Sequence, residues 1–215
     1  AVSNKVERLI LVHTTGIYSK FKSASEDYMR IESDVRTTLE RAKARMGVVY
    51  LRPTMIYGNI NDMNMVVFIK MLDRLRLFPI INHGRSRLQP VNGKDLGKAY
   101  YQLLSKPEIM NGDYILSGEK PLTMLDMFQT ISRQLGKRTI FLNVPLPIGV
   151  TMASILKATS LGRLDLVEKV QRMGEDRHFP HDAATKDFGY APMPFGDGLR
   201  IEIEQYLTNK TLNSI

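Results

Sequence analysis

The amino-acid sequence predicts an α/β protein, built from part of a doubly wound parallel sheet and a smaller mixed α/β lobe. The run RLILVHT at 8–14 is apolar without alternation, which is typical of a strand buried on both faces. Apolar residues then recur at helical spacing, and a second apolar strand, Val48–Leu51, follows them. Strand, helix and strand in this order are typical of a parallel crossover unit.

The helix between these strands is predicted from apolar residues at steps of three and four. Ser25 can cap its first turn, where Glu26 and Asp27 complement the helix dipole, and Gly47 ends it. Because an apolar stripe on one side of a helix faces the core, we expect these residues to pack against the sheet. The stripe consists of Tyr28, Ile31, Val35, Leu39, Ala42 and Met46.

Helices and short strands alternate through the rest of the chain. Asp62 is expected to start a Met-rich helix that runs to about Arg76, with Met63, Met65 and Met71 filling gaps in the core. The further elements expected are strands at 78–81, 114–116 and 139–143, an extended stretch at 85–92, helices capped by Asp95 (to about Ser105) and by Thr123 (ended by Gly136), a helix at 150–173 interrupted near Gly162, and closing helices at 182–188 and 198–207.

The composition is that of a globular protein with a basic surface. Hydrophobic residues make up 43% of the 215 residues, which is enough to bury a core. There are no cysteines, which excludes disulfides and thiolate chemistry. The longest apolar stretch, 144–155, is too short and too interrupted to span a membrane. We therefore expect a cytoplasmic protein with no membrane partner.

The net charge of +8 has three interpretations. The first is a solvated surface, and the second is a basic cleft for a phosphorylated small ligand. Nucleic acid is not expected as a partner, because the basic residues are scattered and no basic stripe is interleaved with aromatic residues. No metal site is expected either, because His13, His83, His178 and His181 are dispersed and no third ligand is obvious beside the last two.

No glycine-rich turn of the kind that holds a dinucleotide pyrophosphate follows a predicted strand. Gly93 and Gly97 are interpreted as turn and packing residues. The favoured explanation is that the chain is a piece of a longer enzyme, because two or three parallel strands alone would leave an open edge and an uncovered apolar face. The alternative is a naturally short protein whose sheet is completed by a partner or a second subunit.

Five stretches, in order and spanning almost the whole chain, carry the motifs of one enzyme family. They are Thr14–Tyr18 (TTGIY), Tyr28 on the following helix, Leu51–Gly58 (LRPTMIYG), Gln89–Leu96 (QPVNGKDL) and Asp182–Leu199, which contains FGYAP. The chain resembles the C-terminal portion of an extended short-chain dehydrogenase/reductase of the NAD-dependent epimerase/dehydratase type. The resemblance implies a partial Rossmann-like fold, with the remaining half of the NAD(P)-binding domain and interleaved lobe segments at 1–110 and mainly the substrate lobe and closing helices at 111–215.

The resemblance implies two catalytic residues. Thr14 stands four residues before Tyr18, where the family has its catalytic Ser or Thr, and its hydroxyl would donate to the substrate oxygen. Tyr28 matches the family's catalytic tyrosine. Structural alternatives stay open, because a strand-end threonine also satisfies backbone groups and Tyr28 begins the apolar stripe. His13 is interpreted as a strand-end polar residue rather than a base.

The sequence departs from the family one helical turn after the tyrosine. The family has a lysine four residues after its tyrosine, which stabilises the phenolate and holds the nicotinamide ribose, whereas this chain has Glu32. A carboxylate there would disfavour the phenolate. Three interpretations follow: Glu32 faces solvent while Lys20 or Lys22 supplies the charge, Tyr28 acts only as a hydrogen-bond donor, or the site is degenerate.

The resemblance also implies binding residues for a cofactor and a substrate. Pro53 and Thr54 are candidate backbone contacts to the nicotinamide carboxamide, and Tyr28 would lie beside the cofactor. Arg85 and Arg87 are candidates for the substrate diphosphate, because a guanidinium binds phosphate through two hydrogen bonds. The family's arginine aligns with Leu88, however, so the structural alternative for Arg85 and Arg87 is that they are solvated. The structural alternative for Pro53 is a proline that only ends a strand.

Two functions are consistent with these residues. The first is a portion of an NAD(P)-dependent oxidoreductase or epimerase that acts on a secondary alcohol or ketone, with a nucleoside-diphosphate sugar as the candidate substrate. NAD or NADP would bind the intact protein, and this chain alone would bind it weakly or not at all. The second is a non-catalytic, nucleotide-sensing or assembly-stabilising protein of the same fold. A second copy of the chain, forming a homodimer, is a candidate partner.

Overall fold

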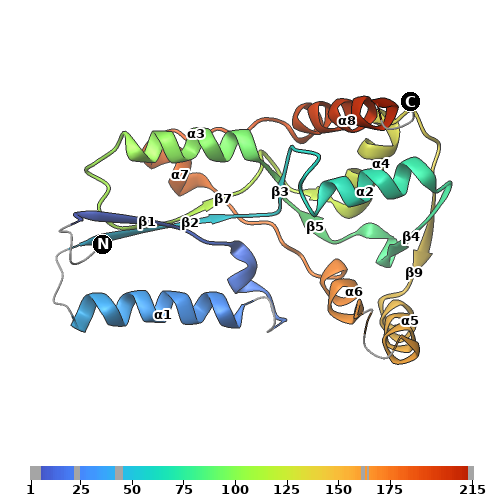
Figure 1. Ribbon diagram of the computed structural model, residues 1–215, viewed down its shortest axis with the longest axis horizontal. Coiled ribbons are helices and arrows are strands. Elements are labelled where there is room, and N and C mark those ends of the chain that lie inside the picture. Colours follow the sequence, from blue (N-terminus) through green and yellow to red (C-terminus); the bar gives the residue numbers. More distant parts are fainter. Residues whose placement is uncertain (1–5, 22–24, 42–45, 161–162, 164, 213–215) are drawn as a thin grey trace. The chain divides into compact units, whose positions relative to one another are not determined.

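The computed structural model describes residues 6–21, 25–41, 46–160, 163 and 165–212, which form two compact units (Figure 1). Unit 1 contains residues from 1–56, 90–119 and 179–193, and unit 2 contains residues from 57–89, 120–178 and 194–215. Each unit is thus assembled from separate stretches of the chain. The division of ligand-binding roles between 1–110 and 111–215 stays a prediction.

Unit 1 is built on a three-stranded parallel sheet in the order β1-β2-β7. Helix α1 (Glu26–Arg41) connects β1 to β2, so the predicted parallel crossover unit is confirmed. The strands are β1 (Arg8–Val12), β2 (Gly47–Pro53) and β7 (Gly112–Leu116).

Helices cover both faces of this sheet. Figure 1 shows α3 (Gly93–Leu104) and α7 (Asp182–Phe188) on one side and α1 on the other. Alternate residues of a strand point to opposite faces, and Val49 and Leu51 of β2 are fully buried in the core with α3 and α7. The doubly wound α/β arrangement predicted from the sequence is therefore present. A short strand, β6 (Val91–Asn92), precedes α3.

The prediction that α1 buries an apolar stripe is wrong. Tyr28 and Ile31 are 41% and 42% exposed, and none of the 16 residues of α1 is buried. Val12 of β1 is 50% exposed, so this strand is not buried on both faces either. The physical reason is that a three-stranded sheet offers α1 a narrow apolar surface, and charged side chains make its main contacts. Ala42 lies outside the described residues.

Unit 2 is a mixed α/β lobe, as predicted. Strand β4 pairs with β9 in parallel, and β5 pairs with β8 in antiparallel fashion. Its elements are α2 (Met65–Arg74), β4 (Leu77–Ile81), the 3-10 turn η4 (Asn82–Gly84), β5 (Arg87–Leu88), β8 (Leu122–Thr123), α4 (Met124–Gln134), β9 (Ile140–Val144), α5 (Leu146–Thr159), α6 (Val167–Met173) and α8 (Phe195–Leu212). The chain passes from unit 1 to unit 2 within β3 (Ile56–Tyr57).

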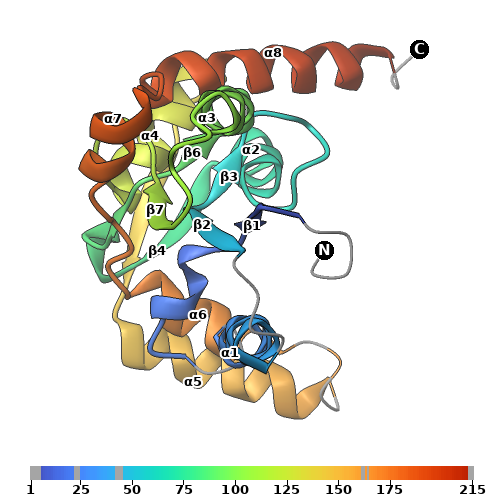
Figure 2. The same ribbon diagram turned by 90° about the vertical axis from the view of Figure 1, so that its left-hand side faces the viewer.

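Aromatic rings fill the core of unit 2. Phe128 of α4 lies 5.0 Å from Phe68, 4.9 Å from Phe78 and 6.5 Å from Phe141 between ring centroids. Figure 2 shows the helices of the unit from a second side. Large buried rings contribute most of the apolar area in such a lobe, so these contacts bring α2, α4, β4 and β9 together.

Two helix starts differ from the sequence-based prediction. Asn92, not Asp95, caps α3, because the Asn92 side chain accepts a hydrogen bond from the Lys94 backbone at 2.9 Å. Asp95 lies in the first turn, is buried, and accepts a hydrogen bond from the Met193 backbone at 2.9 Å. Helix α2 begins at Met65 rather than at residue 62.

The methionines of this region are not all core residues. Met65 is fully buried as predicted, but Met63 is 84% exposed because it precedes the helix, and Met71 is 37% exposed. By contrast, the predicted cap of α4 is confirmed. Thr123 and Asp126 form a reciprocal capping box.

Candidate functional site

Hydroxyl-bearing residues follow the carboxyl ends of all three parallel strands in unit 1. Thr14 lies two residues after β1, Thr54 directly follows β2, and Ser117 directly follows β7. Parallel strands end at the same edge of a sheet, and ligands of open α/β sheets bind beyond that edge. This carboxyl edge is the candidate site of unit 1. Ser117 is missing from the sequence-based predictions, although a polar residue after an apolar strand is the signal for it.

Thr14 is held in a tight turn. Its Oγ1 accepts a hydrogen bond from the Gly16 backbone at 3.0 Å and caps the 3-10 helix η2 (Thr15–Tyr18). The structural alternative, in which Thr14 satisfies local backbone groups, is therefore observed. Because this bond uses the oxygen as an acceptor, the hydroxyl hydrogen can still be donated to a substrate oxygen. The catalytic role of Thr14 stays a prediction.

Tyr28 lies in the first turn of α1 and packs on His13. The two rings meet edge-on at 4.8 Å between centroids, and His13 Nε2 lies 3.2 Å from the carbonyl oxygen of Tyr28. His13 is buried and joined to this helix, which agrees with its interpretation as a strand-end polar residue. The catalytic role of Tyr28 stays a prediction.

A charged network centred on Arg52 links α1 to the sheet. The Arg52 side chain is 4% exposed, and its guanidinium donates to both carboxylate oxygens of Glu32 and to both of Asp113, at 2.6 and 2.7 Å for the latter pair. Glu32 also lies 3.3 Å from His13 Nδ1. These bonds tie the middle of α1 to strand β2, and Asp113 ties the same arginine to β7.

Two tyrosines complete the surroundings of Arg52. The guanidinium carbon lies 5.7 Å from the centre of the Tyr18 ring and 5.3 Å from that of Tyr50. Burial opposes the charge on Arg52, but the hydrogen bonds to Asp113 and Glu32 outweigh it and raise the pKa of Arg52 above its usual value. The arginine is therefore always charged.

The interpretation that Glu32 faces solvent is wrong. Its side chain is 18% exposed and is bound by Arg52 through two hydrogen bonds. The family that the chain resembles has a lysine at this position. In this chain Glu32 instead joins α1 to the sheet. Lys22 lies outside the described residues, so the proposal that Lys20 or Lys22 supplies the positive charge stays a prediction.

The end of β2 is buried and already hydrogen-bonded. The Pro53 carbonyl accepts from the Thr15 hydroxyl at 3.2 Å, and the Thr54 backbone N–H donates to the Leu116 carbonyl at 3.2 Å. A carbonyl oxygen can accept two hydrogen bonds, so Pro53 keeps one lone pair for a carboxamide N–H. The Thr54 N–H, by contrast, already donates its one hydrogen bond to the Leu116 carbonyl. The cofactor-binding roles of both residues stay predictions.

Ser117 is a structural residue. It is fully buried, its hydroxyl donates to the Phe179 carbonyl at 2.8 Å, and its oxygen lies 2.8 Å from His181 Nδ1. The Tyr190 hydroxyl donates to the Ser117 carbonyl at 2.7 Å. Burial lowers the pKa of His181, so this histidine is neutral at physiological pH. Since no ligand reaches a fully buried hydroxyl, Ser117 orders the 179–190 segment at the carboxyl edge.

In unit 2, the predicted substrate arginines Arg85 and Arg87 are both exposed. Arg85 follows η4, and Arg87 lies in β5, where its backbone N–H donates to Asp176 at 2.7 Å. No ion pair joins either side chain to a carboxylate within the described residues. Both guanidinium groups are therefore accessible to an anionic ligand, and their substrate-binding role stays a prediction.

Arg177, which the sequence-based predictions omit, lies beside Arg87. Its backbone N–H donates to the Arg87 carbonyl at 2.7 Å. Its Nε is buried and has no hydrogen-bond partner among the described residues. Burial, and then the neighbouring Arg172, lower the pKa of Arg177. An anion would relieve both costs, because it supplies an acceptor and an opposite charge.

A buried carboxyl group distinguishes the end of unit 2 that contains α8. Glu202 is fully buried, and its Oε2 accepts a hydrogen bond from the Gly58 backbone at 2.7 Å. Burial first, and then the neighbouring carboxylate of Asp62, raise the pKa of Glu202 to about 8. Glu202 is therefore largely protonated at neutral pH, and it joins α8 to the loop that follows β3.

This raised pKa makes unfolding pH-dependent. An unfolded Glu titrates near pH 4.3, so folding holds the proton between about pH 4.3 and 8, and stability falls as pH rises through that window. In the unmodified protein the free energy of unfolding should fall by on the order of 2–3 kcal/mol across this window, and Glu202→Gln should abolish that decrease. Urea midpoints measured from pH 5 to pH 8 would show it, with the exposed Glu204→Gln as control. Equal slopes in both variants would contradict the raised pKa.

Among the described residues, no three or more His, Asp or Glu side chains gather closely enough to hold a metal ion. In the same part of the chain, no helix combines the length and apolar character needed to cross a membrane.

Several solved structures that resemble this chain are enzymes of nucleotide sugars. The UDP-glucose 4-epimerase of Thermotoga maritima, solved with UDP-glucose, matches 97% of this chain with a TM-score of 0.70 at 13% identity. The UDP-glucuronic acid 4-epimerase of Bacillus cereus, in complex with UDP-glucuronic acid and NAD, matches 94% at 0.69 and 15% identity. The dTDP-glucose 4,6-dehydratase of Streptomyces venezuelae, with NAD bound, matches 99% at 0.69 and 17% identity.

These likenesses establish the fold. The chain has the Rossmann-like α/β fold of epimerases and dehydratases, as the sequence motifs predicted, and it covers 66%, 62% and 63% of the three structures. It thus spans slightly less than two thirds of their length. Comparison with protein-family models and with curated proteins finds no match.

Proposed function

We propose that the chain is the substrate-side portion of an NAD(P)-dependent oxidoreductase or epimerase that acts on a secondary alcohol or ketone, with a nucleoside-diphosphate sugar as substrate. The observation that carries this proposal is the carboxyl edge of unit 1, where Thr14 keeps a hydroxyl hydrogen to donate and Pro53 keeps a carbonyl lone pair. The three solved structures above, two with NAD bound and one with UDP-glucose, support the choice of ligands.

The residues of the edge divide the proposed work. Bound NAD(P) supplies a carbon that accepts or returns a hydride. Thr14 donates a hydrogen bond to the substrate oxygen, and the Tyr28 hydroxyl exchanges a proton with that oxygen. Pro53 orients the carboxamide through its carbonyl oxygen, and Thr54, whose N–H already donates to Leu116, lies beside it.

For the substrate diphosphate we propose the arginines of unit 2. Arg87 and Arg85 are exposed, and Arg177 has a buried Nε without a partner among the described residues. Guanidinium groups bind phosphate oxygens through charge-assisted, paired hydrogen bonds, so this group suits a diphosphate better than a neutral sugar.

A second candidate function rests on Glu32. Because Glu32 occupies the position of the family's lysine and is bound by Arg52, the chain has no lysine four residues after Tyr28. This favours a non-catalytic member of the fold that senses a nucleotide or stabilises an assembly. Such a protein would bind the same ligands without changing them.

Cofactor binding tests the common premise of both candidates. Titration of the natural protein that contains these residues with NADH and NADPH should give saturable, micromolar binding, seen as enhanced nicotinamide fluorescence. The 215-residue chain alone should bind at least about 100-fold more weakly, because no glycine-rich turn is present to hold the pyrophosphate. Equally tight binding by the 215-residue chain, or no binding by the natural protein, would contradict this account.

A further inference from the structure

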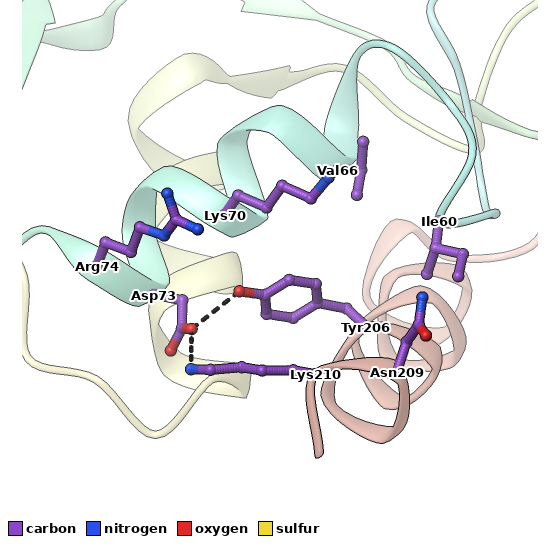
Figure 3. Close-up of a pocket in the computed structure, with 8 residues that line it drawn as sticks. All are labelled: Ile60, Val66, Lys70, Asp73, Arg74, Tyr206, Asn209 and Lys210. Carbon is purple, nitrogen blue, oxygen red and sulfur yellow. Dashed lines mark hydrogen bonds and ion pairs between the residues drawn. The ribbon is translucent and has the colours of Figure 1, made fainter. Parts of the chain in front are cut away.

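We propose that a cavity between α2 and α8 of unit 2 binds a phosphorylated small molecule. The cavity has a volume of about 500 Å³, which lies within the usual range for small-molecule sites. Figure 3 shows Lys70 and Arg74 extending from α2, and Tyr206, Asn209 and Lys210 from α8. All of these residues belong to unit 2, so one compact unit provides the whole site.

The strongest evidence is the placement of positive charge on α2. Lys70 and Arg74 are four residues apart, so they lie on the same face of the helix. Like charges at this spacing destabilise a helix. Neither side chain has an ion pair to a carboxylate within the described residues. Arg74 is the last residue of α2, where the helix dipole offsets this repulsion, so α2 presents two exposed positive charges that an anionic ligand can reach.

The acidic residue of the cavity does not cancel this charge. Asp73 is 3% exposed, and it is held by Lys210 and by the Tyr206 hydroxyl at 2.9 Å (Figure 3). Lys137 lies 3.2 Å from its other carboxylate oxygen. Burial alone would raise the pKa of Asp73, but Lys210, Tyr206 and Lys137 outweigh it and lower the pKa to about 2. Two lysines thus outweigh the one negative charge of Asp73, and the net charge around the cavity stays positive.

The charge and the apolar lining together define the ligand. Lys70 and Arg74, which have no carboxylate partner among the described residues, match the two negative charges of a phosphate dianion, which a guanidinium can bind through two hydrogen bonds. Val66 and the Tyr206 ring provide an apolar wall. A phosphate attached to a flat or apolar group therefore fits better than inorganic phosphate.

An amide NMR titration of the natural protein that contains these residues tests the site, with phenyl phosphate as the probe at constant ionic strength. We expect saturable shifts centred on α2 and the C-terminal half of α8, and weaker binding of inorganic phosphate and of benzoate. The double variant Lys70→Gln/Arg74→Gln should weaken phenyl phosphate binding at least about tenfold, since each charge-assisted contact is worth that much.

The matched control is Lys94→Gln/Lys98→Gln on α3, which removes the same charge at the same spacing in unit 1. It should leave the affinity within about twofold. An equal loss in both variants would show that the basic chain attracts the probe without a site. Shifts that do not saturate, or that lie outside α2 and α8, would also overturn the proposal, and benzoate binding as tight as phenyl phosphate would overturn the choice of phosphate. Unchanged thermal unfolding of both variants would show that the fold is intact.

Discussion

Arg52→Ala should unfold or severely destabilise unit 1, by about 3–5 kcal/mol, because it removes the shared partner of two carboxylates. The Arg52 side chain is 4% exposed, and that of Glu32 is only 18% exposed. Without the guanidinium, the carboxylate of Glu32 loses its partner, and α1 has no buried residue of its own to hold it on the sheet. The free energy of unfolding, measured with urea by circular dichroism, checks this expectation.

The matched control is Arg30→Ala on the same helix. Arg30 is 76% exposed and pairs with Asp27 at 3.8 Å, so its loss should cost less than about 0.5 kcal/mol. Similar losses in both variants would show that the buried network does not hold α1. Glu32→Lys should also destabilise the protein, because it would place two positive charges together. This substitution therefore would not restore the function that the lysine has in the family that the chain resembles.

Tyr28→Phe should lower kcat of the natural protein by about 100-fold or more, because it removes the group proposed to exchange a proton with the substrate oxygen. Thr14→Val should lower it comparably, whereas Thr14→Ser should retain most of the activity. The Glu32 carboxylate is bound by Arg52, which partly neutralises its charge beside this site. The measurement is kcat as a function of pH for each variant.

The control is Tyr101→Phe, which changes a tyrosine that is 73% exposed on α3. It should leave kcat unchanged. If Tyr28→Phe also has unchanged turnover across the pH range, its role is structural and the ring packs only on His13. A loss that appears in KM alone would show that Tyr28 contributes to binding and not to proton exchange.

The sequence predicted the sheet of unit 1 well, because the signals there are local. Two apolar runs separated by a helix predict parallel pairing, and the Thr123–Asp126 capping box is readable from residue types alone. The surroundings of α1 were not predictable in this way. An apolar stripe predicts burial only if enough sheet lies opposite, and the width of a sheet is not a local property.

The role of Glu32 shows what the candidate site required beyond sequence. Its position suggested a lost catalytic lysine, but its partner Arg52 lies 20 residues away, within a motif interpreted as a cofactor loop. Arg177 was missed for the same reason, since only the pairing of distant backbone groups places it beside Arg87. Residues that are far apart in the sequence but in contact in the fold have no regular spacing from which their contact could be predicted.

Mixing the natural protein with NAD(P)+ and with UDP-glucose, UDP-glucuronic acid or dTDP-glucose tests the proposed hydride exchange most directly. We expect at least one nucleotide sugar to raise the near-ultraviolet absorbance of reduced nicotinamide, transiently or permanently, and Tyr28→Phe to slow this rise. Saturable binding of cofactor and sugar with no reduced nicotinamide from any of the three would contradict it, and the non-catalytic function would take its place.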